Sequence, residues 1–279
     1  MKWIWVGLAC ATLLAPPSVL ADEADAHYRL AKTLRAEGRY EDALKEIDLA
    51  VAARPTSAEG HLTRGTILRR LERYEDALGA FERAIQLEPE GGRAYGLAGA
   101  VLIRLKRPKA AVKCLRKATE LEPKEANHWL NLGVAYRKLG DNDAAIAAYE
   151  KGLQQLPNDP QLLNNLGVAL RRARRYDQAI EVLEKASDAH PYDANIARNL
   201  AVAYRGAERY KEAIPAYIQA IELGDGQSDL LFDLASCYEK LGNTEMAIAT
   251  YERYIRVVKK TDPDAAKRTQ GTIDRLKKK

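Results

Sequence analysis

Three asparagines recur at a constant interval along the chain: Asn131, Asn165 and Asn199. A second set of amide side chains, four residues earlier each time, keeps the same interval: Asn127, Gln161 and Asn195. A carboxamide offers one acceptor and two donors, which matches the hydrogen-bonding groups of a peptide unit. Such a column is suited to holding an extended polypeptide by its backbone. The alternative is that these amides bond only to water and to their neighbours.

Basic side chains recur at the same interval, six and seven residues after the asparagine positions. Ten of the fourteen residues at these positions are cations, and one is an acid, Glu239; the cations are Arg35, Arg69, Arg70, Arg104, Arg137, Lys138, Arg171, Arg172, Arg205 and Lys240. The whole chain has a net charge of only +5, so positive charge is concentrated here. Guanidinium groups bind carboxylates in forked pairs, and a groove of one sign attracts partners of the other. If these positions end helices, the helix dipole is an alternative reason for the cations.

The chain lacks the patterns expected for catalysis, phosphate binding or metal coordination. It contains no G-x-S-x-G, no H-E-x-x-H and no phosphate-binding glycine loop. His128 and His190 have no Cys or carboxylate partner at ligand spacing. His27 and His61 fall in a column that we expect to be interior. We therefore predict a protein that is not an enzyme, with no cofactor, no metal and no small-molecule substrate.

The same interval divides the chain from Ala24 to Thr261 into seven units of equal length, without an insertion or deletion. We number the positions of each unit from 1 to 34. Position 20 is always alanine: Ala43, Ala77, Ala111, Ala145, Ala179, Ala213 and Ala247. Position 24 is always large: Ile47, Phe81, Leu115, Tyr149, Leu183, Tyr217 and Tyr251. Position 8 is always glycine or alanine, so small and large side chains alternate in a fixed order.

These columns predict two helices in every unit. Positions 4, 7, 8 and 11 share one face of a helix, which we call helix A, and positions 20, 24 and 27 share one face of a second, helix B. A proline at position 32 ends helix B in the first five units. One such pair cannot bury its apolar face alone, whereas stacked neighbours can. The elements that position the amides and arginines are thus the A helices of a stacked array.

The unit from 126 to 159 resembles a tetratricopeptide repeat (TPR) most closely. The residues that carry the resemblance are Trp129, Leu132, Gly133, Tyr136, Ala145, Tyr149, Gly152 and Pro157. It implies an all-α, right-handed α-solenoid of seven helix-turn-helix repeats: 24–57, 58–91, 92–125, 126–159, 160–193, 194–227 and 228–261. It also implies that the A helices line a concave face that binds peptides. The asparagine column resembles the asparagine ladder of the O-linked N-acetylglucosamine transferases, whose catalytic domain has no counterpart here.

Three departures from the repeat pattern stand out. Arg64 replaces an apolar residue at position 7 of repeat two, and Asp225 replaces the proline after repeat six. Pro215 falls inside helix B of repeat six, where it is expected to delay or kink the helix. We expect repeats six and seven to be joined more loosely than the others.

The two ends of the chain differ from the repeats. Residues 1–21, with Lys2 followed by a short apolar run, have the layout of a secretory signal peptide; an uncleaved anchor is the alternative. Residues 262–279 predict a polar, basic capping helix and tail rather than a membrane-binding or targeting tail. We expect a chain secreted across the inner membrane into a bacterial periplasm, without a transmembrane span once mature.

We therefore predict a protein–protein interaction scaffold of the periplasm or cell envelope that binds an extended, acidic polypeptide segment. The predicted contact residues on the concave face are Asn131, Asn165, Asn199, Asn127, Gln161, Asn195, Arg69, Arg104, Arg137, Arg171 and Arg205. A nucleic-acid binder with a basic groove is an alternative, disfavoured because aromatic residues suited to base stacking are sparse there. An accessory subunit of an envelope assembly or secretion complex is a narrower form of the first prediction.

Overall fold

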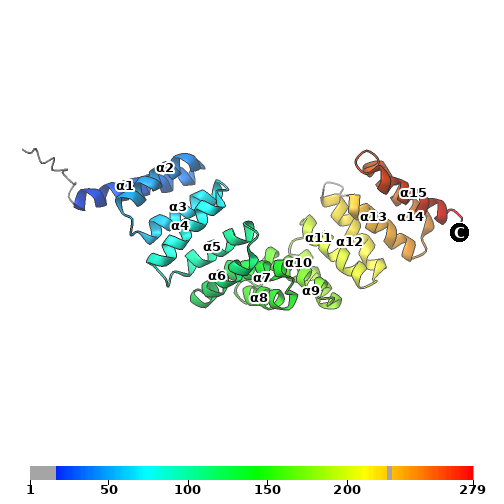
Figure 1. Ribbon diagram of the computed structural model, residues 1–279. Helices are drawn as coiled ribbons and strands as arrows, with labels where there is room; N and C mark the ends of the chain where they lie inside the picture. The colour runs from blue at the N-terminus through cyan, green and yellow to red at the C-terminus, as the bar shows by residue number, and fades with distance from the viewer. Residues whose placement is uncertain (1–16, 225–227, 279) are drawn as a thin grey trace, which may run out of the picture. The chain divides into compact units, whose positions relative to one another are not determined.

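The structure, a computed structural model, describes residues 17–224 and 228–278. Within these ranges the chain forms fifteen helices and no strand (Figure 1). The chain divides into two compact units, residues 1–107 and 108–279. Most of the predicted signal peptide lies outside the described residues.

The first unit holds five helices: α1 (Pro17–Ala36), α2 (Tyr40–Ala53), α3 (Ala58–Arg70), α4 (Tyr74–Leu87) and α5 (Gly92–Arg104). Helices α1, α3 and α5 are A helices, and α2 and α4 are B helices. The first helix begins at Pro17, so the last residues of the predicted signal peptide are helical and continuous with repeat one. Whether residues 1–21 are removed as a signal peptide stays a prediction.

The second unit holds ten helices. They are α6 (Pro108–Leu121), α7 (Ala126–Leu139), α8 (Asn142–Gln155), α9 (Pro160–Arg172), α10 (Tyr176–Ala189), α11 (Ala194–Gly206), α12 (Tyr210–Leu223), α13 (Ser228–Lys240), α14 (Thr244–Val258) and α15 (Pro263–Leu276). Helices α7, α9, α11 and α13 are A helices. The last helix, α15, packs Ile273 and Leu276 against Tyr251 of α14 and so covers the apolar side of the final repeat.

The small-residue columns mark the places where helices meet. All seven alanines at position 20 are completely buried. A methyl group added at Gly133 would overlap the ring of Tyr149, and one added at Gly167 would overlap the side chain of Leu183. Positions 8 and 24 of one repeat are therefore complementary in size. The large side chain of helix B packs directly against the backbone of helix A. In the second unit one continuous cluster of buried side chains extends from Ala126 to Cys237.

The turn from helix A to helix B requires a left-handed backbone at position 15. Three repeats place glycine there, and the other four use Glu72, Lys106, Arg174 and Glu208 with φ between 58° and 60°. Glycine adopts this conformation without strain, whereas a residue with a Cβ does so at a cost. The conformation lets the next amide bond back to helix A, as from Arg39 N to Leu34 O at 2.9 Å. The turn geometry is thus constant although its residue is not.

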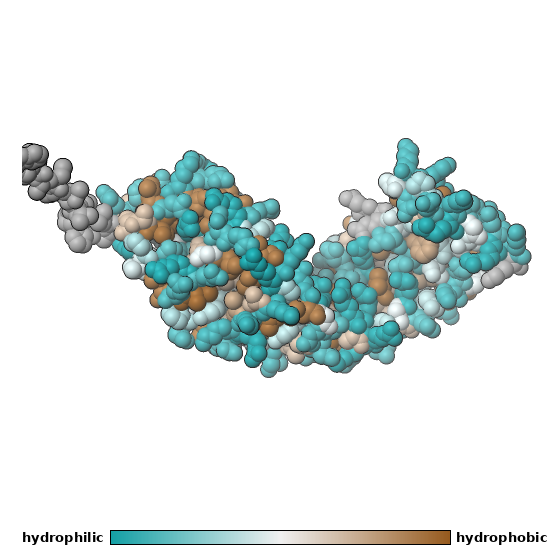
Figure 2. All heavy atoms as spheres, in the orientation of Figure 1, coloured by the Kyte–Doolittle hydropathy of each residue, from teal (hydrophilic) through white to brown (hydrophobic). Residues whose placement is uncertain are grey.

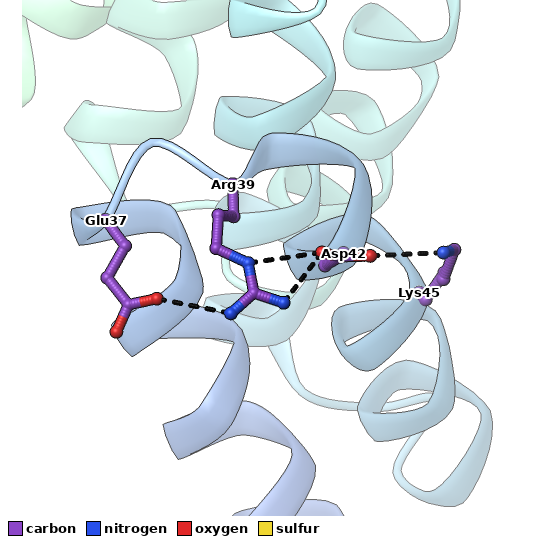
Figure 3. Close-up of polar contacts among 4 residues, drawn as sticks. All are labelled: Glu37, Arg39, Asp42 and Lys45. Atoms are coloured by element: carbon purple, nitrogen blue, oxygen red, sulfur yellow. Dashed lines mark hydrogen bonds and ion pairs between the residues drawn. The ribbon is translucent and has the colours of Figure 1, made fainter.

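The charged residues of the first turn show how these corners are stabilised (Figure 3). Arg39, at the start of α2, donates to Asp42 Oδ2 at 2.9 and 3.2 Å and lies 3.5 Å from Glu37. Lys45 donates to the other oxygen of Asp42 at 3.1 Å. The hydrogen bond from Arg39 lowers the pKa of the Asp42 carboxyl. These groups are exposed, so they orient the corner more than they stabilise the fold.

Of the two effects expected of Pro215, the delayed start of the helix does not occur, and the kink stays a prediction. Helix α12 begins at Tyr210, the same position of the repeat at which α10 begins at Tyr176. Pro215 is the sixth residue of the helix, so it removes only one hydrogen bond close to the N-terminus. Asp225 lies outside the described residues, so the looser connection after it stays a prediction.

The described helices show no candidate membrane span: none is both long and apolar enough to cross a bilayer. The visible face of the molecule is mostly hydrophilic, with only small apolar patches between polar side chains (Figure 2). This surface is typical of a helical array that buries its apolar residues between repeats.

Candidate functional site

The predicted contact residues of the second unit lie on its A helices. Neighbouring A helices touch one another, α7 with α9 and α9 with α11. The amide of Asn199 on α11 donates to Asn164 Oδ1 on α9 at 2.7 Å, which joins two successive repeats. We call the surface formed by Asn131, Asn165, Asn199, Arg137, Arg171 and Arg205 the A-helix face. These six of the eleven predicted residues thus lie on three A helices that contact one another in sequence.

The three asparagines at position 6 are half-buried, and two of them use one N–H group within the protein. Asn165 donates to the Gln161 carbonyl at 2.8 Å, and Asn199 donates to Asn164. In the described part of the chain, no other hydrogen bond is formed by these two amides. Each therefore keeps a carbonyl oxygen and one N–H group for a ligand, which is the pair of groups that a peptide backbone requires.

The amides at position 2 are exposed and lie at the N-terminal ends of the A helices. Asn127 donates to Glu125 at 2.9 Å, and Gln161 and Asn195 face solvent. Asn195 also lines an open pocket of about 580 Å³. Tyr192, on the rim of this pocket, is 86% exposed. Sequence reasoning missed this side chain, since no column of the repeat places an aromatic residue at position 33.

Two arginines of the A-helix face, Arg137 and Arg171, are half-buried and lack a carboxylate partner among the described residues. The Nε atoms of both are buried, that of Arg171 without a hydrogen-bond partner in the described chain, whereas Arg137 lies against the Tyr149 hydroxyl. Burial raises the pKa of Tyr149, and the hydrogen bond with Arg137 opposes the rise. Burial lowers the pKa of Arg171, and the positive charges of Arg172 and Arg205 lower it further. An arginine still carries its charge at neutral pH under these conditions. The two groups are therefore partly desolvated cations without counter-ions.

The next arginine along the same column, Arg205, has a counter-ion within the protein. Its Nε donates to the Tyr217 hydroxyl at 2.9 Å, and its Nη2 lies 3.1 Å from Asp233 Oδ2. Tyr217 in turn donates to Asp233 at 3.2 Å. Burial alone would lower the pKa of Arg205, but Tyr217 and Asp233 outweigh it and raise the pKa. Asp233 occupies position 6 of repeat seven, so reading the asparagine column one repeat further would have found it.

Repeat seven replaces the arginine of this column by Glu239. The hydroxyl of Tyr251 donates to Glu239 Oε2 at 3.0 Å. Burial raises the pKa of Tyr251, and the hydrogen bond to Glu239 raises it further. The positive column of the second unit therefore ends at repeat six.

The remaining two predicted arginines belong to the first unit. Arg69 is half-buried, and burial lowers its pKa. Arg104 is exposed and lies 5.7 Å from the ring centroid of Tyr74, to whose hydroxyl it donates at 3.3 Å. The Nε atom of Arg69, like that of Arg171, is buried without a hydrogen-bond partner among the described residues, but the following repeat has Leu97 in place of an amide at position 6. Over the described ranges, no group of three or more His, Cys, Asp or Glu is arranged to hold a metal.

Family profiles described as tetratricopeptide repeat match residues 12–58, 68–133, 124–191, 158–226 and 192–260. The last three matches begin at residues 124, 158 and 192, one repeat length apart. This chain is a tetratricopeptide-repeat protein. The repeat family and the all-α class predicted from the sequence are thereby confirmed. TPR proteins are generally interaction scaffolds without catalytic activity.

Solved TPR structures share the fold at low sequence identity. A TPR protein from Parabacteroides merdae matches with a TM-score of 0.66 and 13% identity, over 89% of this chain and 99% of its own. PilF from Pseudomonas aeruginosa matches with a TM-score of 0.64 and 20% identity, over 75% and 95%. YrrB, described as having an unusual peptide-binding site, matches with a TM-score of 0.56 and 24% identity, over 66% and 97%. Among curated proteins, no sequence matches this chain significantly.

Proposed function

We propose that this TPR protein binds an extended, net-acidic polypeptide segment along the A-helix face of α7, α9 and α11. The observation that carries the proposal is the coincidence of two columns on that face. One consists of amides with free donors and acceptors. The other consists of half-buried arginines, of which Arg137 and Arg171 have no carboxylate partner among the described residues. A TPR array offers its side chains on a preformed surface, so a segment bound there loses entropy while the protein loses little.

The spacing of the asparagines suits an extended ligand. Packed helices lie about 8–10 Å apart, and an extended chain advances about 3.3 Å per residue. One step between neighbouring A helices therefore corresponds to about three residues of ligand. Each asparagine then meets a backbone unit of the segment without contacting every side chain, which makes the ladder tolerant of sequence.

The arginines favour acidic side chains in the segment. A guanidinium group in a partly desolvated place gains more from a carboxylate than one in free solvent, because the pair is screened less. A surface of one sign also speeds the encounter with an oppositely charged segment. Charge thus selects the class of segment, and the amides hold its backbone.

The proposed site of action is the bacterial periplasm or the cell envelope. Its support is the layout of residues 1–21, in which a lysine precedes a short apolar run. Fractionation of cells that express the full chain tests it. Recovery of a shortened protein with the periplasmic fraction is expected, and full-length protein in the cytoplasm would contradict it.

The binding proposal is tested by replacing Asn131, Asn165 and Asn199 together with alanine. Peptides selected by the wild-type protein from a displayed random library are expected to bind the triple variant at least about tenfold more weakly, a loss of about 1.4 kcal/mol. The matched control replaces three exposed amides on B helices, Gln154, Gln155 and Gln178. Circular dichroism should show equal helix content in both variants. Equal affinity of the triple variant and the control would remove the ladder from the site.

A further inference from the structure

Side chains from three positions of the repeat meet at the step from repeat six to repeat seven. In repeat six they are position 12 (Arg205), position 24 (Tyr217) and position 6 of the next repeat (Asp233), joined by the contacts of 2.9 to 3.2 Å described above. The same positions one step earlier carry Arg171, Leu183 and Asn199. Two steps earlier they carry Arg137, Tyr149 and Asn165. The helix pairs are the same at all three steps, whereas the net charge of the three side chains differs between them.

At repeat six the protein supplies its own carboxylate. Asp233 has a side chain only 21% exposed, and it accepts both from Tyr217 and from Arg205. A carboxylate in this place neutralises the arginine and satisfies its outer nitrogen. An acidic ligand gains little from a guanidinium group that is already paired.

At repeats four and five the corresponding residues are neutral amides. Asn165 and Asn199 carry no charge, and neither Arg137 nor Arg171 has a carboxylate partner among the described residues. In addition, Arg171 is close enough to Arg172 and Arg205 for their charges to lower its pKa. Like charges at this separation repel, so a negative group from outside relieves an existing electrostatic cost.

We propose that two carboxylates of the bound segment pair with Arg137 and Arg171, as Asp233 pairs with Arg205. Repeats four and five then bind the acidic side chains of the segment. In repeat six the protein's own Asp233 already occupies the corresponding place. This inference rests on the proposed function and specifies the register and chemistry of the ligand. Since neighbouring A helices are about three extended residues apart, the two carboxylates are spaced about three residues apart in the segment.

The probe for the test is a fluorescein-labelled peptide of twelve residues, Gly-Ser-Asp repeated four times, compared with Gly-Ser-Asn repeated four times. Fluorescence anisotropy at low salt measures both affinities with the full chain. The wild-type protein is expected to bind the Asp peptide at least about tenfold more tightly than the Asn peptide. The Asn peptide reports backbone binding alone.

The decisive variant is Asn165→Asp, which gives repeat four the internal carboxylate that repeat six already has. Its affinity for the Asp peptide is expected to fall about tenfold, and its affinity for the Asn peptide to change less than twofold. The control Gln178→Glu adds the same charge to the exposed surface of α10 and should bind both peptides as the wild type does. In an Arg137→Ala background, Asn165→Asp should have little further effect, because the arginine it would neutralise is gone.

The reciprocal variant, Asp233→Asn, removes the internal carboxylate of repeat six. It is expected to bind the Asp peptide several-fold more tightly, because Arg205 becomes a third subsite. An affinity unchanged in both Asn165→Asp and Asp233→Asn would overturn the inference while leaving segment binding intact, provided that the wild type binds either peptide. If the wild type binds neither peptide, the proposed function and the inference are both wrong.

Discussion

The backbone is the same in two pairs of repeats, four and five against six and seven. The charges on their A helices differ. In the first pair, Arg137 and Arg171 have no carboxylate partner among the described residues, and a neutral amide occupies position 6 of the following repeat. In the second pair, Arg205 is matched by Asp233, and the following arginine position holds Glu239, bonded to Tyr251. The difference teaches that a uniform repeat can carry a different charge balance along its length when one residue per repeat changes.

The two regions share their interior. Ala145 and Ala179 in one region and Ala213 and Ala247 in the other are all completely buried. The large residue at position 24 is likewise fully buried in repeats four to six. The two regions therefore differ in the polar groups at the edge of a core that they have in common.

The largest expected effect tests whether the core is the same in both regions. Ala145→Leu in repeat four and Ala213→Leu in repeat six each force extra methylenes into a packed helix contact. Overpacking of this kind costs about 1–3 kcal/mol, so both variants should unfold at lower urea concentration than the wild type, and by similar amounts. If one variant were as stable as the wild type, position 20 would not be a close helix contact in that region.

The next effect concerns binding at the unpaired arginines. Arg171→Ala should weaken binding of the Asp peptide about tenfold, or about 1.4 kcal/mol, because it removes one of two acidic subsites. The matched control is Lys185→Ala, which removes an exposed cation from α10 in the same repeat. Anisotropy titrations compare the two. Equal losses in both variants would mean that only the overall positive charge matters, not the place of Arg171.

The smallest effect concerns the internal carboxylate and depends on pH. Burial raises the pKa of Asp233 above the ordinary 3.8, and Arg205 and Tyr217 oppose the shift only in part. Folding thus favours the protonated form of Asp233 over the ionised form. The contribution of this group to the free energy of unfolding is present below about pH 3.8, and it is lost as the pH rises through the raised pKa of the folded state.

Asp233→Asn removes this titration while keeping the shape of the side chain. The free energy of unfolding of the wild type minus that of the variant should therefore decrease from pH 4 to pH 7. Urea denaturation at several pH values measures this difference. A difference that grows over the range would show that the pairing with Arg205 dominates burial instead.

Most of the fold was predictable because it follows from a periodic pattern. A column of one alanine per repeat, facing a column of large side chains, allows little besides stacked helix pairs. Pro215 misled the prediction because a proline matters most in the helix interior, and the repeat places it close to the start of α12. The left-handed turns at Glu72 and Lys106 were not predictable, since neither is glycine.

The helices that carry the candidate contact residues were predictable, but the ion pairs that these residues form were not. The spacing placed Asn165, Asn199, Arg137 and Arg171 on the A helices, where the structure has them. It treated Arg205 as one more free arginine, because its partner Asp233 belongs to the following repeat. Pairing across repeats depends on how one helix pair rests on the next, which a column within each repeat does not show.

The central claim is that an acidic segment lies along the A helices of repeats four to six. Backbone amide shifts of the isotopically labelled protein, recorded by nuclear magnetic resonance while the Asp peptide is added, test it most directly. The account predicts that the largest shift changes fall on α7, α9 and α11, around Asn131, Asn165 and Asn199. Changes concentrated on the B helices α8 and α10, with the A helices unaffected, would contradict it.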